Sequence, residues 1–511
     1  GVFGYRLLLF FYRRSTRLLN WQPPQRVLPL LVLPFLFGYL LLTGDAVSTR
    51  RAFYVATAAA VFWWWRYSVN PLRLLQTLAL LFLLFNPLLL WQPGWQLSFA
   101  GATGILLWRP LWQRLPDRLP LLLQAPARLL LVTAAATLAT LPLVLENFHL
   151  LAPAGLFANL VAVPAVTLLA LPVGLVGLLS GWVPSLAEGC FFCSGLLLNV
   201  LLLLAQKLLE LPFFHAHYLF WSRWEYLALA LLLTPLMLAP QPVFSRNSMR
   251  ILPVLLGLSL LFFSTGSWAG RGLTLHMFSV GQGESLLLTG VEKNAILIDG
   301  GGLYSDRFDV GERLLAPALG ELGVRRLSAV LLTHDHPDHR KGLIFVLRHF
   351  PVDQFWTAQA VSDLHPTLQQ VLRQRRIPVR LFSDGWQRVQ ARQGVSLYLY
   401  RATTPRNEND SSLVLYLPTP AGGLLLTGDL EKSGVSQLLE TEFPGPVSLL
   451  KLPHHGSRHS GSERLIQRLQ PEHCLVSAGF LNRYRFPAGQ LVEFLQQQRI
   501  PLHRTDLDGT V

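Results

Sequence analysis

Apolar runs follow one another from the first residue to Thr265, separated by short polar connections. A helix crosses a bilayer with about 20 residues, or fewer where neighbouring helices bury it. A soluble all-helical core does not account for ten such runs, so the pattern predicts a polytopic α-helical membrane bundle. The predicted spans are residues 1–12, 27–43, 52–65, 74–91, 95–108, 128–146, 155–180, 190–211, 225–240 and 251–265.

The pattern changes after Thr265. Stretches 273–290 and 294–302 place β-branched and apolar runs between glycines, which predicts a hairpin or meander of strands. A buried strand is predicted at 327–333, and helical periodicity returns at 340–350, 364–376 and 461–469. Three further predicted strands, in SSLVLYLP, GGLLLTGD and VSLLKLPHH, end at polar clusters. Strands that stop at ligand-type residues are typical of an α/β sandwich that presents a site at one sheet edge.

The charge distribution supports the same division. The chain holds 17 Lys and Arg against 6 Asp and Glu up to Gly270, and 26 against 23 from Arg271 onward. The first region is charge-poor and basic, whereas the second has the balance of a soluble domain. We therefore predict a membrane domain over 1–268 and a hydrolase-type domain over 271–511. The chain begins inside an apolar run and ends after what looks like the start of a strand, so we expect both domains to be truncated at their outer ends.

The orientation of the bundle is predicted from the basic residues in its connections, which are more frequent on the cytoplasmic side. Alternate connections carry twelve of them, against four on the opposite side. This count places the region after Thr265 on the outer, periplasmic side of an inner membrane. The twelve are Arg13, Arg14, Arg17, Arg26, Arg66, Arg73, Arg109, Arg114, Arg118, Arg128, Arg246 and Arg250; the four are Arg50, Arg51, Lys207 and Arg223.

The stretch THDHPDHRKG (333–342) carries the densest group of metal-type ligands. His334 and His336 alternate by two, so both imidazoles point the same way from an extended segment. Asp338 and His339 follow after a turn that Pro337 helps to set. Two ligands on each side suit two divalent cations, and the mixture of imidazole and carboxylate fits zinc or manganese. The sequence therefore predicts a two-metal centre.

This stretch resembles the HxHxDH signature of the metallo-β-lactamase fold superfamily, which implies an αββα sandwich. The resemblance extends to LLLTGDL and KLPHHGS, in the superfamily's order. It implies that Asp429 bridges both metals and that either His454 or His455 completes the second site. The superfamily commonly has a further ligand histidine before the TGD strand, where this chain reads NENDSSLVL (407–415). Asn409, Asp410 or water is expected to substitute for it.

A narrower resemblance covers nearly the whole chain. The segments SVGQG, LIDGGG, NDSSLVL, KLPHHGSRHS and HRTDLDGTV are similar to the C-terminal domain of ComEC-type DNA internalization (competence) proteins. In the membrane half, TGDAVSTRRAF, QPGWQLSFAGATGIL and FANLVAVPAVTLLALPVGL resemble the competence domain of that family. The chain departs from the family at Ser279 and Glu284, where DVGQGD reads SVGQGE, and at Phe486, where a histidine is usual.

The family resemblance implies DNA uptake in natural transformation. The bundle would be a transmembrane channel for single-stranded DNA, and the second domain a metal-dependent nuclease that degrades the strand not imported. Double-stranded DNA would be the substrate, with membrane lipid, a DNA receptor and a cytoplasmic helicase or ATPase as partners and a homo-oligomer left open. Paired divalent ions generate hydroxide at neutral pH and stabilise charge on phosphate.

Individual catalytic and DNA-binding roles are predicted from position. Asp338 or Asp429 would orient the attacking water, and His455 and Lys451 would stabilise charge or protonate the leaving oxygen. Asp299 is expected to support the loop of the metal site. DNA contacts are predicted for basic residues near the metals and near the bundle, where rim charges usually mark a pathway; these are Arg458, Arg464, Arg50 and Arg51.

Two other functions remain open from the residues. The chain could be a membrane-anchored metallo-hydrolase of another phosphoester, such as a lipid headgroup or phosphorylcholine. It could also be a DNA channel whose C-terminal domain binds DNA without cleaving it.

Overall fold

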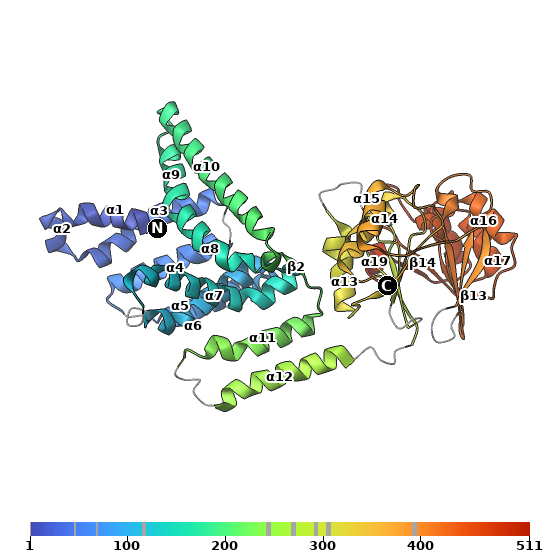
Figure 1. Cartoon of the computed structure of the whole chain (residues 1–511), viewed down its shortest axis with the longest axis horizontal. Helices are drawn as coiled ribbons and strands as arrows, with labels where there is room; N and C mark the ends of the chain where they lie inside the picture. The colour runs from blue at the N-terminus through green and yellow to red at the C-terminus, as the bar shows by residue number, and fades with distance from the viewer. Residues whose placement is uncertain are drawn as a thin grey trace. The chain divides into compact units, whose positions relative to one another are not determined.

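The structure is a computed structural model that describes residues 2–44, 47–67, 70–114, 119–241, 247–266, 272–290, 295–302, 308–390 and 396–511. The chain divides into two compact units (Figure 1). The first comprises Gly1–Leu219 and Arg223–Ser264, and the second comprises Phe220–Ser222 and Thr265–Val511. Arg118 and Arg246, which entered the orientation count, lie outside the described residues.

The first unit is built almost entirely from helices, which confirms the predicted helical bundle. Its helices are α1 (Val2–Arg13), α2 (Thr16–Trp21), α3 (Pro24–Leu42), α4 (Val47–Trp64), α5 (Pro71–Phe85), α6 (Pro93–Gln113), α7 (Leu121–Phe148), α8 (Ala154–Ala165), α9 (Leu171–Leu179), α10 (Pro184–Leu209), α11 (Arg223–Leu238) and α12 (Asn247–Gly266). The π turn η3 (Val166–Ala170) joins α8 to α9, and a 3₁₀ turn, η1 (Pro87–Trp91), follows α5. Eight of the ten predicted spans coincide with a single helix, whereas 74–91 covers α5 and η1, and 155–180 covers α8, η3 and α9.

Four helical segments of the described residues are long and apolar enough to cross a membrane, judged by length and composition. They are Pro24–Leu42, Leu121–Phe148, Ala154–Leu179 and Pro184–Leu209. The segments Pro71–Phe85 and Ile251–Phe263 are apolar but shorter. All ten predicted spans are helical, but only four helical segments of the described residues are long and apolar enough to cross a membrane.

Close contact between α6 and α7 depends on a glycine. A Cβ at Gly104 would lie 2.5 Å from both the carbonyl oxygen of Ala135 and the Cβ of Ala139. Only a residue without a side chain allows the two helices to approach to this distance. Small residues at helix contacts are the usual way in which apolar helices pack in a membrane.

The second unit contains two sheets. The six-stranded sheet has the order β3-β4-β5-β6-β7-β8, and the seven-stranded sheet has the order β15-β14-β13-β12-β11-β10-β9. The strands of the first are β3 (Thr274–Met277), β4 (Leu286–Thr289), β5 (Ala295–Ile298), β6 (Leu327–Leu331), β7 (Phe355–Thr357) and β8 (Val379–Leu381). Those of the second are β9 (Gly385–Gln390), β10 (Ser396–Arg401), β11 (Val414–Thr419), β12 (Gly422–Leu426), β13 (Val447–Lys451), β14 (His473–Val476) and β15 (Leu502–Arg504).

Alternating residues of the strands build two separate cores, as the period of two requires. On β11, Leu415 and Leu417 face a core shared with Leu286 and Leu331 of the other sheet. Val414 and Tyr416 face the opposite way, into a core completed by helices α16 (Lys432–Leu439), α17 (Ser462–Leu469) and α18 (Gly489–Gln497). Figure 1 shows α13 (Ala316–Glu321), α14 (Pro337–His349) and α15 (Pro366–Arg375) flanking the strands on the other side. The second unit is thus the predicted αββα sandwich.

Candidate metal centre

The ligand-rich stretch lies between the end of β6 and the start of α14. Asp299, directly after β5, holds the first part of this loop: its carboxylate accepts hydrogen bonds from the Thr333 backbone N–H at 2.9 Å and from the Thr333 hydroxyl at 2.7 Å. Pro337 occupies the first turn of α14, where a missing N–H costs nothing. The parallel neighbours β5 and β6 therefore bring Asp299 beside the histidines, which is the supporting position predicted for it.

Each of three histidines is held through its Nδ1 atom, and the Nε2 atom of each faces a common space. His339 Nδ1 lies 2.7 Å from Asp299 Oδ2, and His455 Nδ1 donates to the carbonyl of Ser477 at 2.9 Å. His334 Nδ1 lies 3.1 Å from the Thr333 hydroxyl. A hydrogen bond at one nitrogen orients an imidazole so that the other can bind a metal.

Asp429 completes this group from the loop after β12. Its Oδ2 atom lies 3.3 Å from both His339 Nε2 and His455 Nε2. These two Nε2 atoms, His334 Nε2 and Asp429 Oδ1 are buried without a regular hydrogen-bond partner among the described residues. Buried polar atoms are rarely left unsatisfied, so four of them converging on one space fit the binding of a cation.

Three groups of side chains could each hold a metal ion. They are His334, His339 and Asp429; Asp338, His339 and His455; and Glu284, Asp429 and His455. Within each group the ligand atoms lie within 4.8 Å of one another. Imidazole and carboxylate are the donors that divalent transition metals prefer, so the residues fit such an ion.

Two predicted ligands lie outside these groups. His336 Nε2 pairs with Glu408 at 2.7 Å, and its side chain is 36% exposed. His454 Nδ1 lies 3.4 Å from Glu431 Oε1. Of the two adjacent histidines left open by the sequence, the structure brings His455 to Asp429. Both His454 and His455 have positive φ angles, which turn their side chains in different directions.

The two residues expected to replace the absent histidine make other contacts. Asn409 Nδ2 donates to Glu431 Oε1 at 3.0 Å. Asp410 Oδ1 accepts from the backbone N–H groups of Glu431 and Gly434, at 3.0 and 2.9 Å, and so caps the N-terminus of α16. Neither residue belongs to the three groups above. The sequence spacing gave no sign of this cap, because α16 begins some twenty residues later in the chain.

Lys451 and Glu284 form an ion pair that the sequence did not reveal. Both side chains are fully buried, and the Lys451 ammonium contacts the Glu284 carboxylate directly. The ammonium also donates to the Gly428 carbonyl at 2.9 Å and lies 3.8 Å from Asp429 Oδ1. Lys451 thus stands behind Asp429, shielded from solvent. An acidic residue at the end of VGQGE was the one available signal for Glu284.

Charges within the group shift the pKa values of its members. Burial lowers the pKa of His334 well below its ordinary value. Burial acts in the same direction on His339, but Asp429 and Asp299 outweigh it and raise the pKa of His339 well above the ordinary value. His455 and His339 overcome the burial of Asp429 and hold the pKa of its carboxyl well below the usual range. The carboxylates of Asp429 and Asp299 thus favour a positive charge at this position.

Of the four arginines predicted to contact DNA, two are exposed and two are half-buried. Arg458 and Arg464 are exposed, and Arg464 also donates to Ser436 Oγ at 3.0 Å. Arg51 is half-buried on α4, where its guanidinium donates to the Ser98 carbonyl of α6 and lies 5.8 Å from the Phe99 ring. Arg50, its neighbour, is also half-buried.

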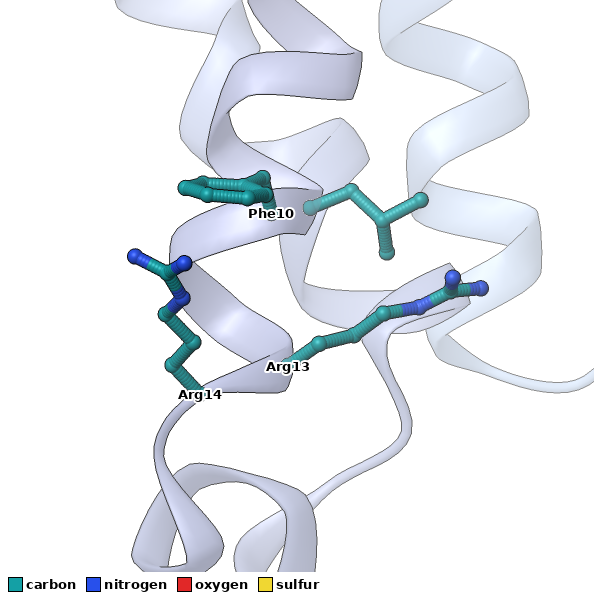
Figure 2. A pocket seen from close by; sticks show the side chains of 4 residues that line it. Phe10, Arg13 and Arg14 are labelled. Atoms are coloured by element: carbon teal, nitrogen blue, oxygen red, sulfur yellow. The ribbon is translucent and has the colours of Figure 1, made fainter.

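A separate surface hollow lies on the first unit, at the end of α1. Figure 2 shows Arg13 and Arg14 among the side chains that line it. The Arg14 guanidinium lies 4.0 Å from the centroid of the Phe10 ring. Leu9 lines it as well. None of the metal-type residues described above lies there, so this hollow is unrelated to the candidate metal centre.

Comparison with known proteins matches both units. Residues 2–243 match the family described as Competence protein. Residues 279–479 match the Metallo-beta-lactamase superfamily. The first unit is thus similar to the Competence protein family, and the second unit to the metallo-β-lactamase superfamily. This confirms the family resemblance of both halves.

Individual proteins are also similar to this chain. ComE operon protein 3 of Bacillus subtilis is 29% identical over 94% of this chain and 63% of its own length. The uncharacterized protein YcaI of Escherichia coli is 28% identical over 81% of this chain and 52% of its own length. The chain thus spans between half and two thirds of the length of these relatives. Among solved structures, CmlA, a diiron β-hydroxylase from Streptomyces venezuelae, matches 48% of this chain and 54% of its own, at 15% identity and a TM-score of 0.32.

Proposed function

We propose that this chain takes part in DNA uptake during natural transformation. Its first unit would form a transmembrane path for single-stranded DNA, and its second unit would be a metal-dependent nuclease that degrades the strand not imported. The observation that carries the nuclease proposal is the convergence of His334, His339, His455 and Asp429, with unsatisfied buried atoms directed at one space. The match of residues 2–243 to the Competence protein family supports DNA as the substrate.

The residues divide into three roles. His334, His339 and Asp429 would hold one divalent ion, and Asp338 and His455 are the candidates for a second, because the one remaining nitrogen of His339 can serve a single ion. When bound, such ions lower the pKa of water and stabilise the charge that develops on phosphate. The Asp338 side chain is 20% exposed, against 4% for Asp429, so Asp338 is the better placed of the two carboxylates to orient an attacking water.

Lys451 would act through its neighbours rather than on the leaving oxygen. Its ammonium has no exposed surface and is occupied by Glu284 and Gly428. We propose that Lys451 and Glu284 fix the Asp429 carboxylate between His339 and His455. This makes Lys451 a positioning residue.

DNA cleavage by the purified full chain tests the nuclease role. With added Mn²⁺ or Zn²⁺, wild-type protein should cut labelled single- or double-stranded DNA, and Asp429→Ala should reduce the rate at least about 100-fold. Arg373→Ala, which removes an exposed arginine of α15, is the control and should retain activity. A metal-loaded wild-type chain that leaves DNA intact, but hydrolyses a lipid headgroup or phosphorylcholine ester, would replace DNA as the substrate.

The channel role is tested separately. Arg51 joins α4 to α6 through the Ser98 carbonyl, so Arg51→Glu should lower transformation in cells while leaving DNA cleavage by the purified chain unchanged. Transformation that is unaffected by Arg51→Glu would remove Arg51 from the DNA path.

A further inference from the structure

A loop beside the candidate metal centre carries unusually exposed rings. It runs from Gly479 to Phe486, directly after β14, and reads GFLNRYRF. Phe480 is 74% exposed, Leu481 is 86% exposed and Tyr484 is 43% exposed. Large apolar side chains elsewhere in the second unit lie mainly in its two cores. An exposed group of this kind needs a binding partner to explain it.

The loop is held in a defined shape by one side chain. Asn482 Nδ2 donates to the carbonyls of Gly479 and Phe486, at 2.9 and 2.8 Å, and Asn482 Oδ1 accepts from the Phe486 N–H at 2.8 Å. The loop is also tied to the HHG segment, because the Ala488 N–H donates to the Gly456 carbonyl at 2.9 Å. The rings are therefore presented by an ordered support next to His455.

The rings of this loop form a continuous stack that reaches the metal-type residues. Tyr484 and Phe486 are nearly parallel, with ring centroids 5.5 Å apart and an interplanar angle of 19°. Phe486 in turn lies nearly parallel to His455, at 6.3 Å and 19°. Tyr484 is the exposed end of the stack, and His455 is its buried end. Phe486, which departs from the family's usual histidine, is the ring that links them.

The charge around the stack is positive. Residues 478–488 (AGFLNRYRFPA) contain two arginines and no acidic residue. The Arg483 guanidinium lies 4.9 Å from the centroid of the Tyr484 ring. Arg485 is exposed as well, and so is Arg458, which follows His455 by three residues. Exposed rings interleaved with arginines are the pattern that binds unpaired bases and a phosphate backbone together.

We propose that Phe480 and Tyr484, with Tyr484 backed by Phe486, form a stacking platform for the unpaired bases of a single nucleic-acid strand, and that it leads the strand's backbone toward His455. This assignment rests on the proposed action of the chain on DNA. A lipid surface would also accept exposed aromatic and basic side chains, but it gives no reason for parallel rings that continue inward to a metal-type histidine. A base-stacking platform requires that arrangement. Bases of an intact duplex are already stacked on one another, so the platform selects unpaired strands.

Binding in the absence of divalent metal isolates this proposal from the nuclease proposal. The full chain in lipid nanodiscs, kept in EDTA, is titrated with a fluorescent 20-nucleotide oligothymidylate and with an abasic strand of equal length and charge. The intact strand should bind more tightly, because each stacked base contributes to affinity. Tyr484→Ala should weaken binding of the intact strand about tenfold and leave the abasic strand unchanged. Leu381→Ala, which removes an exposed apolar side chain of β8, is the matched control and should alter neither.

Two outcomes would overturn the platform. Equal binding of intact and abasic strands by the wild-type chain would show that bases make no contact. Labelling of residues 478–488 by a photoactivatable phospholipid in the nanodisc, with intact and abasic strands binding alike, would assign the loop to the membrane surface. Base-dependent binding that persists in a chain unable to cut DNA with metal would keep the platform and reject only the nuclease proposal.

Discussion

The two units of this chain use the same apolar residues in opposite ways. On the helices of the first unit, large side chains such as Leu84 and Phe85 are exposed, at 77% and 85%. On β4 of the second unit, Leu286, Leu287 and Leu288 are all fully buried. Helices that place apolar residues all round need lipid or other helices to cover them. Strands covered on both faces instead supply a rigid frame for polar groups.

The buried polar groups follow the same division. In the second unit, Glu284, Asp299, His339, Asp429 and Lys451 are buried together at one end of the sandwich. In the described part of the first unit, the buried polar side chains other than tyrosine and tryptophan are two hydroxyls, those of Thr133 and Ser180. Buried charged residues are therefore concentrated in the second unit, where two sheets hold them in place. Substitutions in one unit should accordingly leave the stability of the other unchanged.

The largest expected effect comes from removing the cation of the buried ion pair. Lys451→Met leaves Glu284 buried without its partner, which typically costs about 3–5 kcal/mol. We expect loss of protection from hydrogen exchange in peptides of β12 and β13, with the helices of the first unit unaffected. Lys432→Met, at an exposed lysine, is the control. Equal destabilisation by both variants would contradict the role of the pair.

A substitution in the first unit should destabilise that unit and leave the second unaffected. Gly104→Ala places a Cβ 2.5 Å from the Ala135 carbonyl oxygen, and overpacking of this kind costs about 1–3 kcal/mol. Hydrogen exchange should increase in α6 and α7 and stay constant in the sandwich. Gly94→Ala, on the same helix with no atom within 4 Å of the added Cβ, should show no such increase. If Gly94→Ala is equally damaging, the packing argument fails.

In the metal-free chain, the shifted pKa values of the metal-type residues predict a pH dependence of stability in the second unit. The pKa of His339 is raised in the folded state, so its contribution to stability is complete below its ordinary value of 6.5 and is lost as the pH rises through the folded pKa. The pKa of Asp429 is lowered, so its contribution is present above 3.8 and is lost as the pH falls through the folded pKa. In EDTA, protection of β6 should therefore be greatest between about 3.8 and 6.5.

Added metal should change that profile, because a ligand histidine must give up its proton and binding strengthens as the pH rises. Protection of β6 at pH 8 should thus increase on addition of Zn²⁺ or Mn²⁺. A profile that is unchanged by metal would argue against His339 as a ligand.

The smallest expected effect concerns the cap of α16. Asp410→Ala removes the acceptor for two backbone N–H groups and should cost about 1 kcal/mol, with faster exchange at the start of α16. Asp410→Asn retains an oxygen acceptor and is the control. Bound metal should be unchanged in both. A loss of metal in Asp410→Ala and Asp410→Asn would instead support Asp410 as the substitute ligand.

Local patterns were sufficient to predict most of the fold. The apolar runs of the first half are all helical, and 340–350, 364–376 and 461–469 correspond to α14, α15 and α17. The meander over 273–302 is the antiparallel set β3-β4-β5. These elements depend on residues close together in the sequence, where periodicity is informative.

Contacts between distant segments were beyond those patterns. The pairing of Lys451 with Glu284 joins β13 to the loop before β4, and no local spacing encodes it. His454 and His455 could not be distinguished in sequence, because their opposite surroundings follow from two successive positive φ angles. Asp410 was expected to be a metal ligand, but it caps α16. The sequence did not indicate this, because the helix begins far from Asp410 along the chain. The side of the membrane on which the second unit lies stays a prediction.

The central claim is that His334, His339, His455 and Asp429 hold divalent metal. Metal content of the purified full chain, measured by mass spectrometry after loading with Zn²⁺ or Mn²⁺ and desalting, tests it directly. We predict two equivalents in the wild-type chain, a clear loss in Asp429→Ala, and no loss in Arg373→Ala. A wild-type chain without metal, or an Asp429→Ala chain with unchanged metal content, would contradict the claim.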